Sequence, residues 1–253
     1  MRIGAHVSAR APLAEAAERD AEAVQIFLSN PQSWKPPVPR ADADELRVSD
    51  IDVYVHAPYL MNLASPNNRV RIPSRKTLAS TVLAAEAIGA LGVVVHGGSV
   101  GPDESVEVGF ERWRKALESF EVKVPILVEN TAGRGNSVMQ NLENYGPLWD
   151  AIGDLNVGVC LDTCHTWAAG QDMERAVTMI SDMTGGVALV HANDSRDEAG
   201  SNRDRHANLG HGLIPEGLIV SLIAQANTTT IVETPDDNGG QAADIAWLRE
   251  RLA

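Results

Sequence analysis

Nine histidine, aspartate and glutamate side chains stand at positions where they could bind divalent metal ions together. Each lies at the end of a short apolar run of the sequence or in the segment that follows one. Neutral imidazole and carboxylate groups are the ligands of zinc and similar ions. Nine such groups are too many for one tetrahedral ion and indicate a multinuclear site in which a carboxylate bridges two ions. The nine residues are His56, His96, Glu129, Asp162, His165, His191, Asp204, His206 and Glu233.

Taken one at a time, histidines and acids of this kind have other interpretations. A single histidine at the end of a strand is more often a core or loop residue than a ligand, and for His6 and His211 that alternative stays open. Glu129 or Glu233 alone could be a buried acid paired with an arginine. The joint pattern favours metal binding, because acids and imidazoles follow seven of eight successive apolar runs.

The elements that must position these side chains are eight short apolar, β-branched runs, each followed by a helical segment or a loop leading to one. Apolar residues at three- and four-residue steps in 105–120 predict one buried helix face. Ser74 is predicted to cap an alanine-rich helix that ends near Gly89. Eight strand–helix units in series predict an α/β fold, a TIM (β/α)8 barrel, with reactive side chains at the carboxyl ends of the strands. The runs are 1–7, 23–28, 52–58, 92–98, 125–131, 157–163, 187–193 and 229–235.

The composition bounds the class of protein. The chain has 253 residues, 44% of them apolar and 22% charged, which excludes an intrinsically disordered protein and fits one domain spanning 1–253. No apolar run approaches the roughly 20 residues that span a bilayer, and the N-terminal segment lacks the apolar core of a secretory signal. Two cysteines exclude a disulfide scaffold, so we expect the reducing cytoplasm. Nothing in the sequence suggests an obligate interface, so we expect a monomer. Cys160 is expected to fill the barrel interior, and Cys164 is a weaker ligand candidate.

The charge balance bears on the partner. The chain carries 21 Lys and Arg against 34 Asp and Glu, a net charge of −13. Taken alone, this excess of acid argues against a nucleic-acid partner, because phosphate binding usually leaves a basic footprint. A nucleic-acid partner therefore requires a local source of positive charge, which bound divalent ions could supply.

Eight segments of the sequence together resemble the endonuclease IV family, the zinc-dependent apurinic/apyrimidinic endonucleases. The DTCH and ENTAG segments and the Asp-x-His loop are highly specific when they occur together in this order. The resemblance runs from Ile3 to Pro235 and so covers nearly the whole chain. The segments are IGAHVS, VHAPYLMNLASPN, VVHGGS, LVENTAGRG, VGVCLDTCHTWAAG, LVHANDS, RDRHANLGHG and IVETP.

The resemblance implies a TIM barrel that holds three zinc ions, and Mn²⁺ can share such ligands. Glu129 would bridge the first two ions and stand beside the attacking water as the catalytic carboxylate. Zinc lowers the pKa of bound water toward about 7 and so supplies a nucleophile. By resemblance, His56, His96 and Glu129 would hold the first ion; Glu129, Asp162, His191 and Glu233 the second; and His165, Asp204 and His206 the third.

The resemblance also implies a reaction and a partner. The family hydrolyses the phosphodiester on the 5′ side of an abasic site in double-stranded DNA, leaving a 3′-hydroxyl and a 5′-deoxyribose phosphate, and it trims blocked 3′ ends. Gln32 lies in the loop that enters the DNA in this family, where several relatives present an arginine. The residues expected to contact DNA are Gln32, Tyr59, Asn62, Arg69, Arg71 and Arg205.

Two other functions are compatible with parts of the pattern. A metal-dependent sugar isomerase or epimerase of the same barrel superfamily uses strand-end His, Asp and Glu residues with one or two ions. Such an enzyme would give the Asp204–His206 loop no role, and no strand end carries a lysine as general base. A noncatalytic DNA-end-binding protein with structural zinc would be expected to use cysteine-rich sites.

Overall fold

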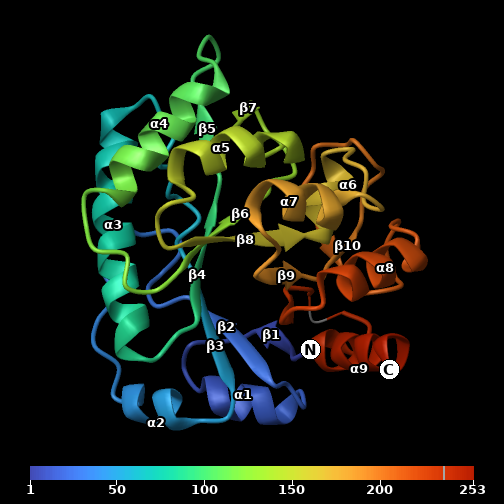
Figure 1. The fold of residues 1–253 in the computed structure, drawn as a ribbon. Helices are drawn as coiled ribbons and strands as arrows, with labels where there is room; N and C mark the ends of the chain where they lie inside the picture. The colour runs from blue at the N-terminus through green and yellow to red at the C-terminus, as the bar shows by residue number, and fades with distance from the viewer. Residues whose placement is uncertain (236) are drawn as a thin grey trace.

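Eight parallel strands form a closed barrel in the computed structural model, which describes residues 1–235 and 237–253 (Figure 1). Each barrel strand pairs with the barrel strands before and after it in sequence, and the last pairs with the first. The predicted TIM barrel is therefore confirmed. The barrel strands are β1 (Ile3–His6), β2 (Ala23–Ile26), β3 (Asp52–His56), β4 (Gly92–His96), β6 (Ile126–Glu129), β8 (Val157–Asp162), β9 (Leu189–His191) and β12 (Thr230–Val232).

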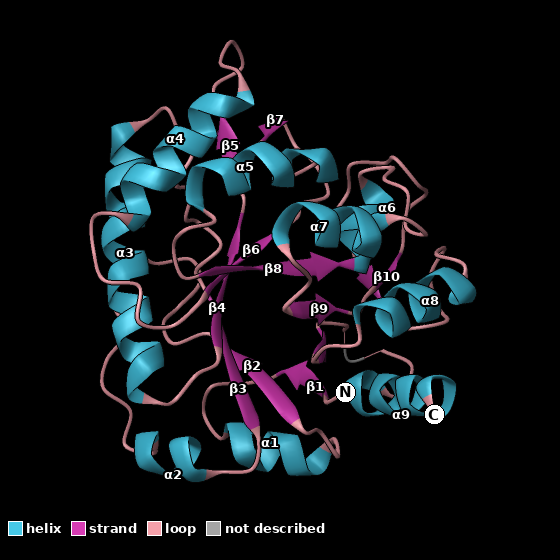
Figure 2. Ribbon diagram, viewed as in Figure 1, coloured by secondary structure: helices cyan, strands magenta, loops and turns pink. Residues whose placement is uncertain are grey.

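Helices cover the outside of the barrel, and two small antiparallel sheets extend its loops (Figure 2). The short strands β5 (Ser99–Val100) and β7 (Asn136–Ser137) form one, and β10 (Asp194–Ser195) and β11 (His206–Ala207) the other. The helices are α1 (Pro12–Glu18), α2 (Ala43–Val48), α3 (Asn68–Ala87), α4 (Val106–Leu117), α5 (Tyr145–Ile152), α6 (Thr163–Ala168), α7 (Ala176–Thr184), α8 (Glu216–Ala226), α9 (Gly240–Leu252) and the 3₁₀ turn Leu142–Asn144.

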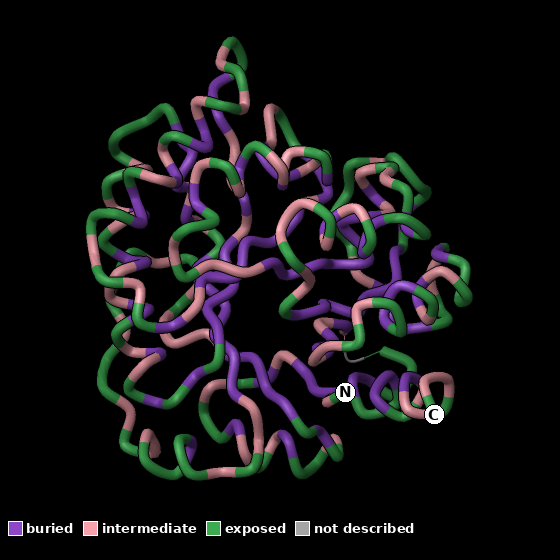
Figure 3. The backbone as a smooth tube through the Cα atoms, in the orientation of Figure 1, coloured by how far each residue is buried: buried purple, intermediate pink, exposed green. Residues whose placement is uncertain are grey.

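The apolar core has two parts, because successive strand residues point to opposite faces of the sheet. One part fills the barrel and includes Tyr54, Leu127 and Cys160; the other lies between the strands and the helices. In Figure 3 the barrel strands are buried along most of their length. Cys160 therefore fills the interior, as predicted. The predicted apolar face of 105–120 is also confirmed, since Trp113 of α4 is fully buried and donates to Gly97 O (2.9 Å).

The predicted start of the alanine-rich helix is wrong. α3 begins at Asn68, and Asn67 caps it by accepting the Arg69 N–H on Oδ1 (2.9 Å). Ser74 lies inside the helix, where its hydroxyl donates to Val70 O (2.8 Å) and accepts the Asn62 N–H (2.9 Å). Serine is a residue type that often caps a helix. The unpaired backbone N–H groups at the start of α3 lie earlier in the chain, however, and the Asn67 side chain accepts one of them.

Candidate metal centre

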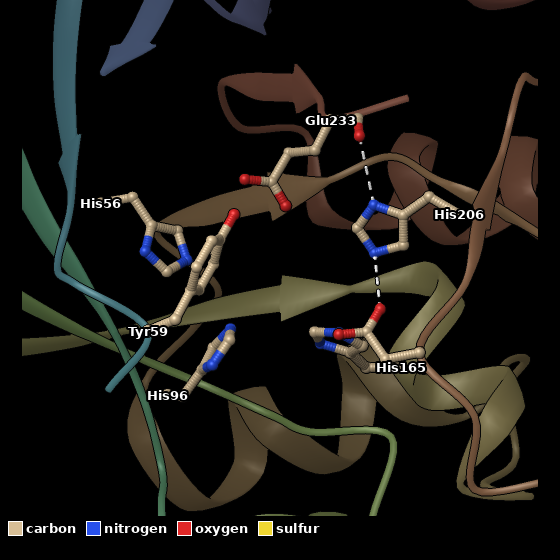
Figure 4. Close-up of a pocket in the computed structure, with 7 residues that line it drawn as sticks. His56, Tyr59, His96, His165, His206 and Glu233 are labelled. Carbon is tan, nitrogen blue, oxygen red and sulfur yellow. Dashed lines mark hydrogen bonds and ion pairs between the residues drawn. The ribbon is translucent and has the colours of Figure 1, made fainter. Parts of the chain in front are cut away.

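The nine predicted ligands come together at the carboxyl end of the barrel. Five of them are the last residues of β3, β4, β6, β8 and β9, and Glu233 directly follows β12. His165 lies in α6, Asp204 in the loop after β10, and His206 in β11. Figure 4 shows side chains of the cluster around a cavity of about 470 Å³. The cavity is lined by His56, Tyr59, His96, His165, Asp204, His206 and Glu233.

The carboxylate of Glu129 is the centre of this cluster and is fully buried at the end of β6. Its Oε2 lies 3.0 Å from His96 Nε2 and 3.4 Å from His56 Nε2. Its Oε1 lies 3.0 Å from His191 Nδ1 and 3.4 Å from His165 Nδ1. Burial alone would raise the pKa of Glu129, but the surrounding imidazoles outweigh burial and hold that pKa well below its ordinary value. Glu129 is therefore an ionised carboxylate with imidazoles around both of its oxygens.

Glu129 belongs to two groups of possible ligands. In one, donor atoms of His56, His96 and Glu129 lie within 4.8 Å of one another. In the other, donor atoms of Glu129, Asp162, His191 and Glu233 lie within the same distance. One carboxylate shared between two such groups is the arrangement that bridges two ions.

Asp204 organises a third group, next to His165 and His206. Its Oδ2 lies 3.2 Å from His165 Nε2, and its Oδ1 lies 3.1 Å from His206 Nε2. Burial lowers the pKa of His206, but the carboxylates of Asp204 and Asp162 outweigh burial and raise it to about 9. Asp204 and His206, two residues apart, thus bring their side chains together beside His165.

Backbone carbonyl groups fix the orientation of three of the imidazoles. Nδ1–H donates to Ala57 O in His56 (2.7 Å), to Asn130 O in His165 (2.9 Å) and to Glu233 O in His206 (3.2 Å). When each ring is neutral, Nε2 therefore has the lone pair, and this atom faces the cluster. Histidines that bind metals ordinarily donate their second N–H in this way.

Three buried atoms of the cluster that could bind a metal have no hydrogen-bond partner among the described residues: Glu129 Oε2, His165 Nε2 and His206 Nε2. Each lies within 3.4 Å of another ligand atom, but not in the geometry of a hydrogen bond. Buried polar atoms are ordinarily paired. Unpaired nitrogen and oxygen atoms that face one another fit a site for divalent cations, so the residues present are compatible with bound metal.

Two asparagines hold ligands in place and were missed by the sequence reasoning. Asn130 Oδ1 accepts the Asp162 N–H (2.8 Å), and Asn193 Nδ2 donates to Asp162 Oδ2 (2.7 Å). Asn193 Oδ1 also accepts the Glu233 N–H (2.9 Å). Each is buried and follows a ligand at the end of its strand by one or two residues. In the sequence, the signal that could have identified them is an asparagine one or two residues after a strand-end Glu or His, in the segments ENT and HAN.

Both thiols are buried, and burial raises the pKa of Cys160 and of Cys164 to about 12. The neutral thiol is a poor metal ligand. Cys164 lies near Asp204 and His206. The carboxylate of Asp204 and the imidazole of His206 are the stronger candidates for binding a metal there. Cys164 therefore stays the weaker ligand candidate.

The loop that returns from β11 is held by Asp194, a fully buried acid of β10. Its carboxylate accepts the backbone N–H groups of Gly210 (3.2 Å), Gly212 (2.9 Å) and Ile214 (3.0 Å). A Cβ at Gly212 would lie 2.3 Å from Asp194 Oδ1, so only glycine allows this approach. Asp194 therefore supports the β10–β11 hairpin that carries His206.

We expect Asp194→Ala to lower the free energy of unfolding by about 2 kcal/mol or more, because buried amides lose their acceptor. Asp194→Asn keeps one carbonyl oxygen and should cost less. Urea denaturation of both variants measures the effect, with the exposed Asp103→Ala as the control. Equal stability of Asp194→Ala and Asp103→Ala would show that the loop does not depend on this carboxylate.

Comparison with known proteins identifies the group to which this chain belongs. The family described as the xylose isomerase-like TIM barrel matches residues 13–251. The Mycobacterium tuberculosis protein named "Probable endonuclease 4" is 55% identical over 251 residues, covering 99% of each chain. The protein of the same name from Mycobacterium leprae is 53% identical over 253 residues, covering 100% of each. The chain belongs to the endonuclease IV family.

Solved structures agree with membership of the endonuclease IV family. The crystal structure of endonuclease IV from Thermus thermophilus matches with a TM-score of 0.85 and 32% identity, covering 100% of this chain and 99% of that one. A D-tagatose 3-epimerase-like protein matches with a TM-score of 0.81 at 20% identity, covering 100% and 97%. The second likeness shows a shared fold alone.

The residues that family membership suggests as DNA contacts lie in different environments. Gln32 and Arg69 are exposed, after β2 and after β3 respectively. Tyr59 is 55% exposed, and its ring lies 5.0 Å from that of Phe27 and 5.4 Å from that of His56. It therefore presents an aromatic face directly beside the ligand cluster.

Three of the expected DNA contacts already have partners inside the protein. Asn62 bonds to Ser99 through both ends of its amide, including Nδ2 to Ser99 O (2.9 Å). Arg71 donates to Ser65 O, and Arg205 pairs with Asp197 through two hydrogen bonds. These three side chains are therefore engaged in hydrogen bonds within the protein.

His6 and His211, the two histidines outside the nine predicted ligands, lie in different surroundings. His6 Nδ1 lies 2.9 Å from Glu233 Oε1, so His6 contacts a ligand, while His211 is exposed. Among the helices described, none is long and apolar enough to span a bilayer.

Proposed function

We propose that this member of the endonuclease IV family hydrolyses the phosphodiester on the 5′ side of abasic sites in double-stranded DNA and trims blocked 3′ ends. The observation that carries the proposal is the convergence of nine candidate ligand side chains at one end of the barrel, six of them lining one cavity, with Glu129 shared by two groups. Phosphodiester hydrolysis needs an activated water and positive charge beside the phosphate, and a multinuclear site can provide both.

The ions that fit this ligand set are three Zn²⁺ per chain. Imidazole and carboxylate donors without thiolate suit zinc and also Mn²⁺. The proposed sets are His56, His96 and Glu129; Glu129, Asp162, His191 and Glu233; and His165, Asp204 and His206. When bound, the ions would lower the pKa of water and balance charge on the phosphate and on the leaving oxygen.

The residues of the chain have separate parts in this reaction. Glu129 lies at the centre and would hold the attacking water in line through its carboxylate. Its burial keeps bulk water from competing for that position. Tyr59 would pack against the opened abasic site, where no base has to be displaced.

The acidity of the protein is compatible with DNA binding in this proposal. Three divalent ions outweigh the charge of the four ligand carboxylates, and bound metals reverse the local field. Near the cavity Arg134 is an exposed cation on the loop after β6, and it lines a second cavity that shares His96, His165 and Asp204. Arg134 and the exposed Arg69 would supply positive charge for the DNA phosphates, although the net charge of the chain is −13.

The test is a nicking assay on duplex DNA with one abasic site, with and without a chelator, run beside an assay for ketose epimerisation. We expect cleavage on the 5′ side that chelation abolishes, and no epimerisation. The sugar epimerase alternative rests on fold likeness at 20% identity. It gives no role to Asp204 and His206. Metal-dependent epimerisation without nicking would reverse the assignment.

Arg69, in the first turn of α3, and Tyr59, in the loop after β3, should affect DNA binding differently. Arg69→Ala should weaken binding to intact and abasic duplexes equally and reduce the slope of log K against log salt by about 0.9, because a phosphate contact does not read the lesion. Tyr59→Ala should weaken binding to the abasic duplex more, because its ring packs at the opened site. Titrations with both duplexes at several salt concentrations measure both effects, with the exposed Lys115→Ala and Tyr59→Phe as controls. Equal losses on the two duplexes for Tyr59→Ala would exclude the stacking role.

A further inference from the structure

Gln25 is a polar side chain inside the barrel, at the third position of β2 between the apolar residues Val24 and Ile26. It is fully buried. Through a single amide group it contacts two residues of the metal centre. Its Nε2 donates to Glu233 Oε1 (2.6 Å), and its Oε1 lies 3.0 Å from His191 Nε2.

Glu233 determines which way the amide of Gln25 points. An ionised carboxylate only accepts hydrogen bonds, so the group facing Glu233 Oε1 must be the NH₂ end of the amide. The reversed amide would place two oxygens 2.6 Å apart without a proton between them. The oxygen of Gln25 therefore faces His191.

This orientation determines the tautomer of His191. The oxygen of Gln25 can only accept, so Nε2 of His191 carries a hydrogen. When the ring is neutral, Nδ1 has the lone pair, 3.0 Å from Glu129 Oε1 and 3.2 Å from Glu233 Oε2. Two carboxylate oxygens and a nitrogen lone pair at these distances repel one another unless a proton or a metal cation lies among them.

Gln25 also selects the ligand oxygen of Glu233. Oε1 accepts from Gln25 Nε2, and His6 Nδ1 lies 2.9 Å from this oxygen and 3.0 Å from Gln25 Nε2. Oε2 is left facing His191 Nδ1. One amide thus directs Nδ1 of His191 and Oε2 of Glu233 toward the same point.

We propose that Gln25 is a positioning residue for the second ion, acting by presenting His191 Nδ1 and Glu233 Oε2 in ligating orientation. The inference rests on the proposed function, since it takes His191 and Glu233 as ligands of that ion. It differs from the role of the backbone carbonyl groups, which orient one imidazole each, because Gln25 couples two ligands of a single ion.

The test is zinc affinity of Gln25→Met, which keeps the length of the side chain and removes both hydrogen bonds. Zinc competition with a chromophoric chelator should show one of the ions bound about 10–100-fold more weakly, the size expected when a partner of a ligand is lost. The Co²⁺-loaded variant should show an altered visible absorption spectrum. Gln25→Leu provides a second variant, and the thermal midpoint of the metal-free proteins establishes that each is folded.

Thr230→Val is the matched control. Thr230 is also fully buried in the barrel wall, at the amino end of β12, and its hydroxyl donates to Thr228 O (3.3 Å) rather than to a ligand. It should leave zinc affinity and the Co²⁺ spectrum unchanged. Wild-type zinc affinity and spectrum in both Gln25 variants would overturn the role of Gln25 and leave the nuclease assignment standing. A wild-type protein that binds no metal would instead overturn the proposed function and the inference together.

Discussion

Glu129→Gln is expected to lower kcat/KM on abasic duplex DNA by more than about 100-fold while leaving the fold and most of the DNA affinity intact. The carboxylate lies within 3.4 Å of four imidazoles and is shared by two ligand groups. Glutamine has nearly the same shape but no charge, and its NH₂ end has no lone pair with which to bind an ion. The variant should therefore lose the bridge and the position of the water together.

The measurement is single-turnover cleavage with DNA binding and thermal unfolding recorded on the same samples. Glu143→Gln removes the same charge from an exposed position outside the cluster and is the control. Near-normal turnover in Glu129→Gln would mean that the bridging role belongs to another carboxylate. Loss of binding and folding together would mean that Glu129 is chiefly a structural residue.

Removing the metal ions is expected to abolish cleavage and to lower the thermal midpoint by about 10 °C or more. Ions that bind only the folded protein at 1,000 times their dissociation constant contribute about 4 kcal/mol each, and 1 kcal/mol corresponds to about 2–4 °C in a chain of this size. Part of the loss is offset in the metal-free protein, because the buried imidazoles of His165 and His191 gain protons. Burial lowers the pKa of each of these two histidines, but neighbouring acidic groups outweigh burial and raise both well above the ordinary value.

Elemental analysis should give three ions per chain at full activity, and titrating Zn²⁺ into the metal-free protein should restore cleavage. Reconstitution with Mn²⁺ in parallel shows which ion supports the higher rate. Full activity with one ion per chain would exclude the trinuclear site. Asp103→Ala, which lies outside the cluster, should bind and release the ions as the wild type does.

Much of the fold and of the site could be predicted because both depend on the order of residues along each strand. Parallel strands of a barrel bring their carboxyl ends to one edge, so an acid or imidazole that ends a run, such as His96 or Glu129, lies at the same end of the barrel as the others. The buried face of α4 followed from its periodicity in the same way. These features are local in sequence, and their meeting point follows from the closure of the sheet.

The start of α3 could not be predicted from residue type. Asn67 and Ser74 both have side chains that can cap a helix, and the choice between them depends on where the loop after β3 turns. In the structure the Asn62 N–H uses the Ser74 hydroxyl, a contact across twelve residues of chain. Residue type alone does not contain that information.

The order of residues along the chain was enough to predict the barrel, the convergence of nine histidine and acidic side chains at one end of it, and the family. The folded structure was needed to show which atoms of those ligands face one another, that Glu129 is shared, and that Asn62, Arg71 and Arg205 are held by internal partners. A proton position or a ligand orientation depends on a partner that is often far along the chain. Gln25 and His191 are 166 residues apart, and no local pattern of the sequence relates one to the other.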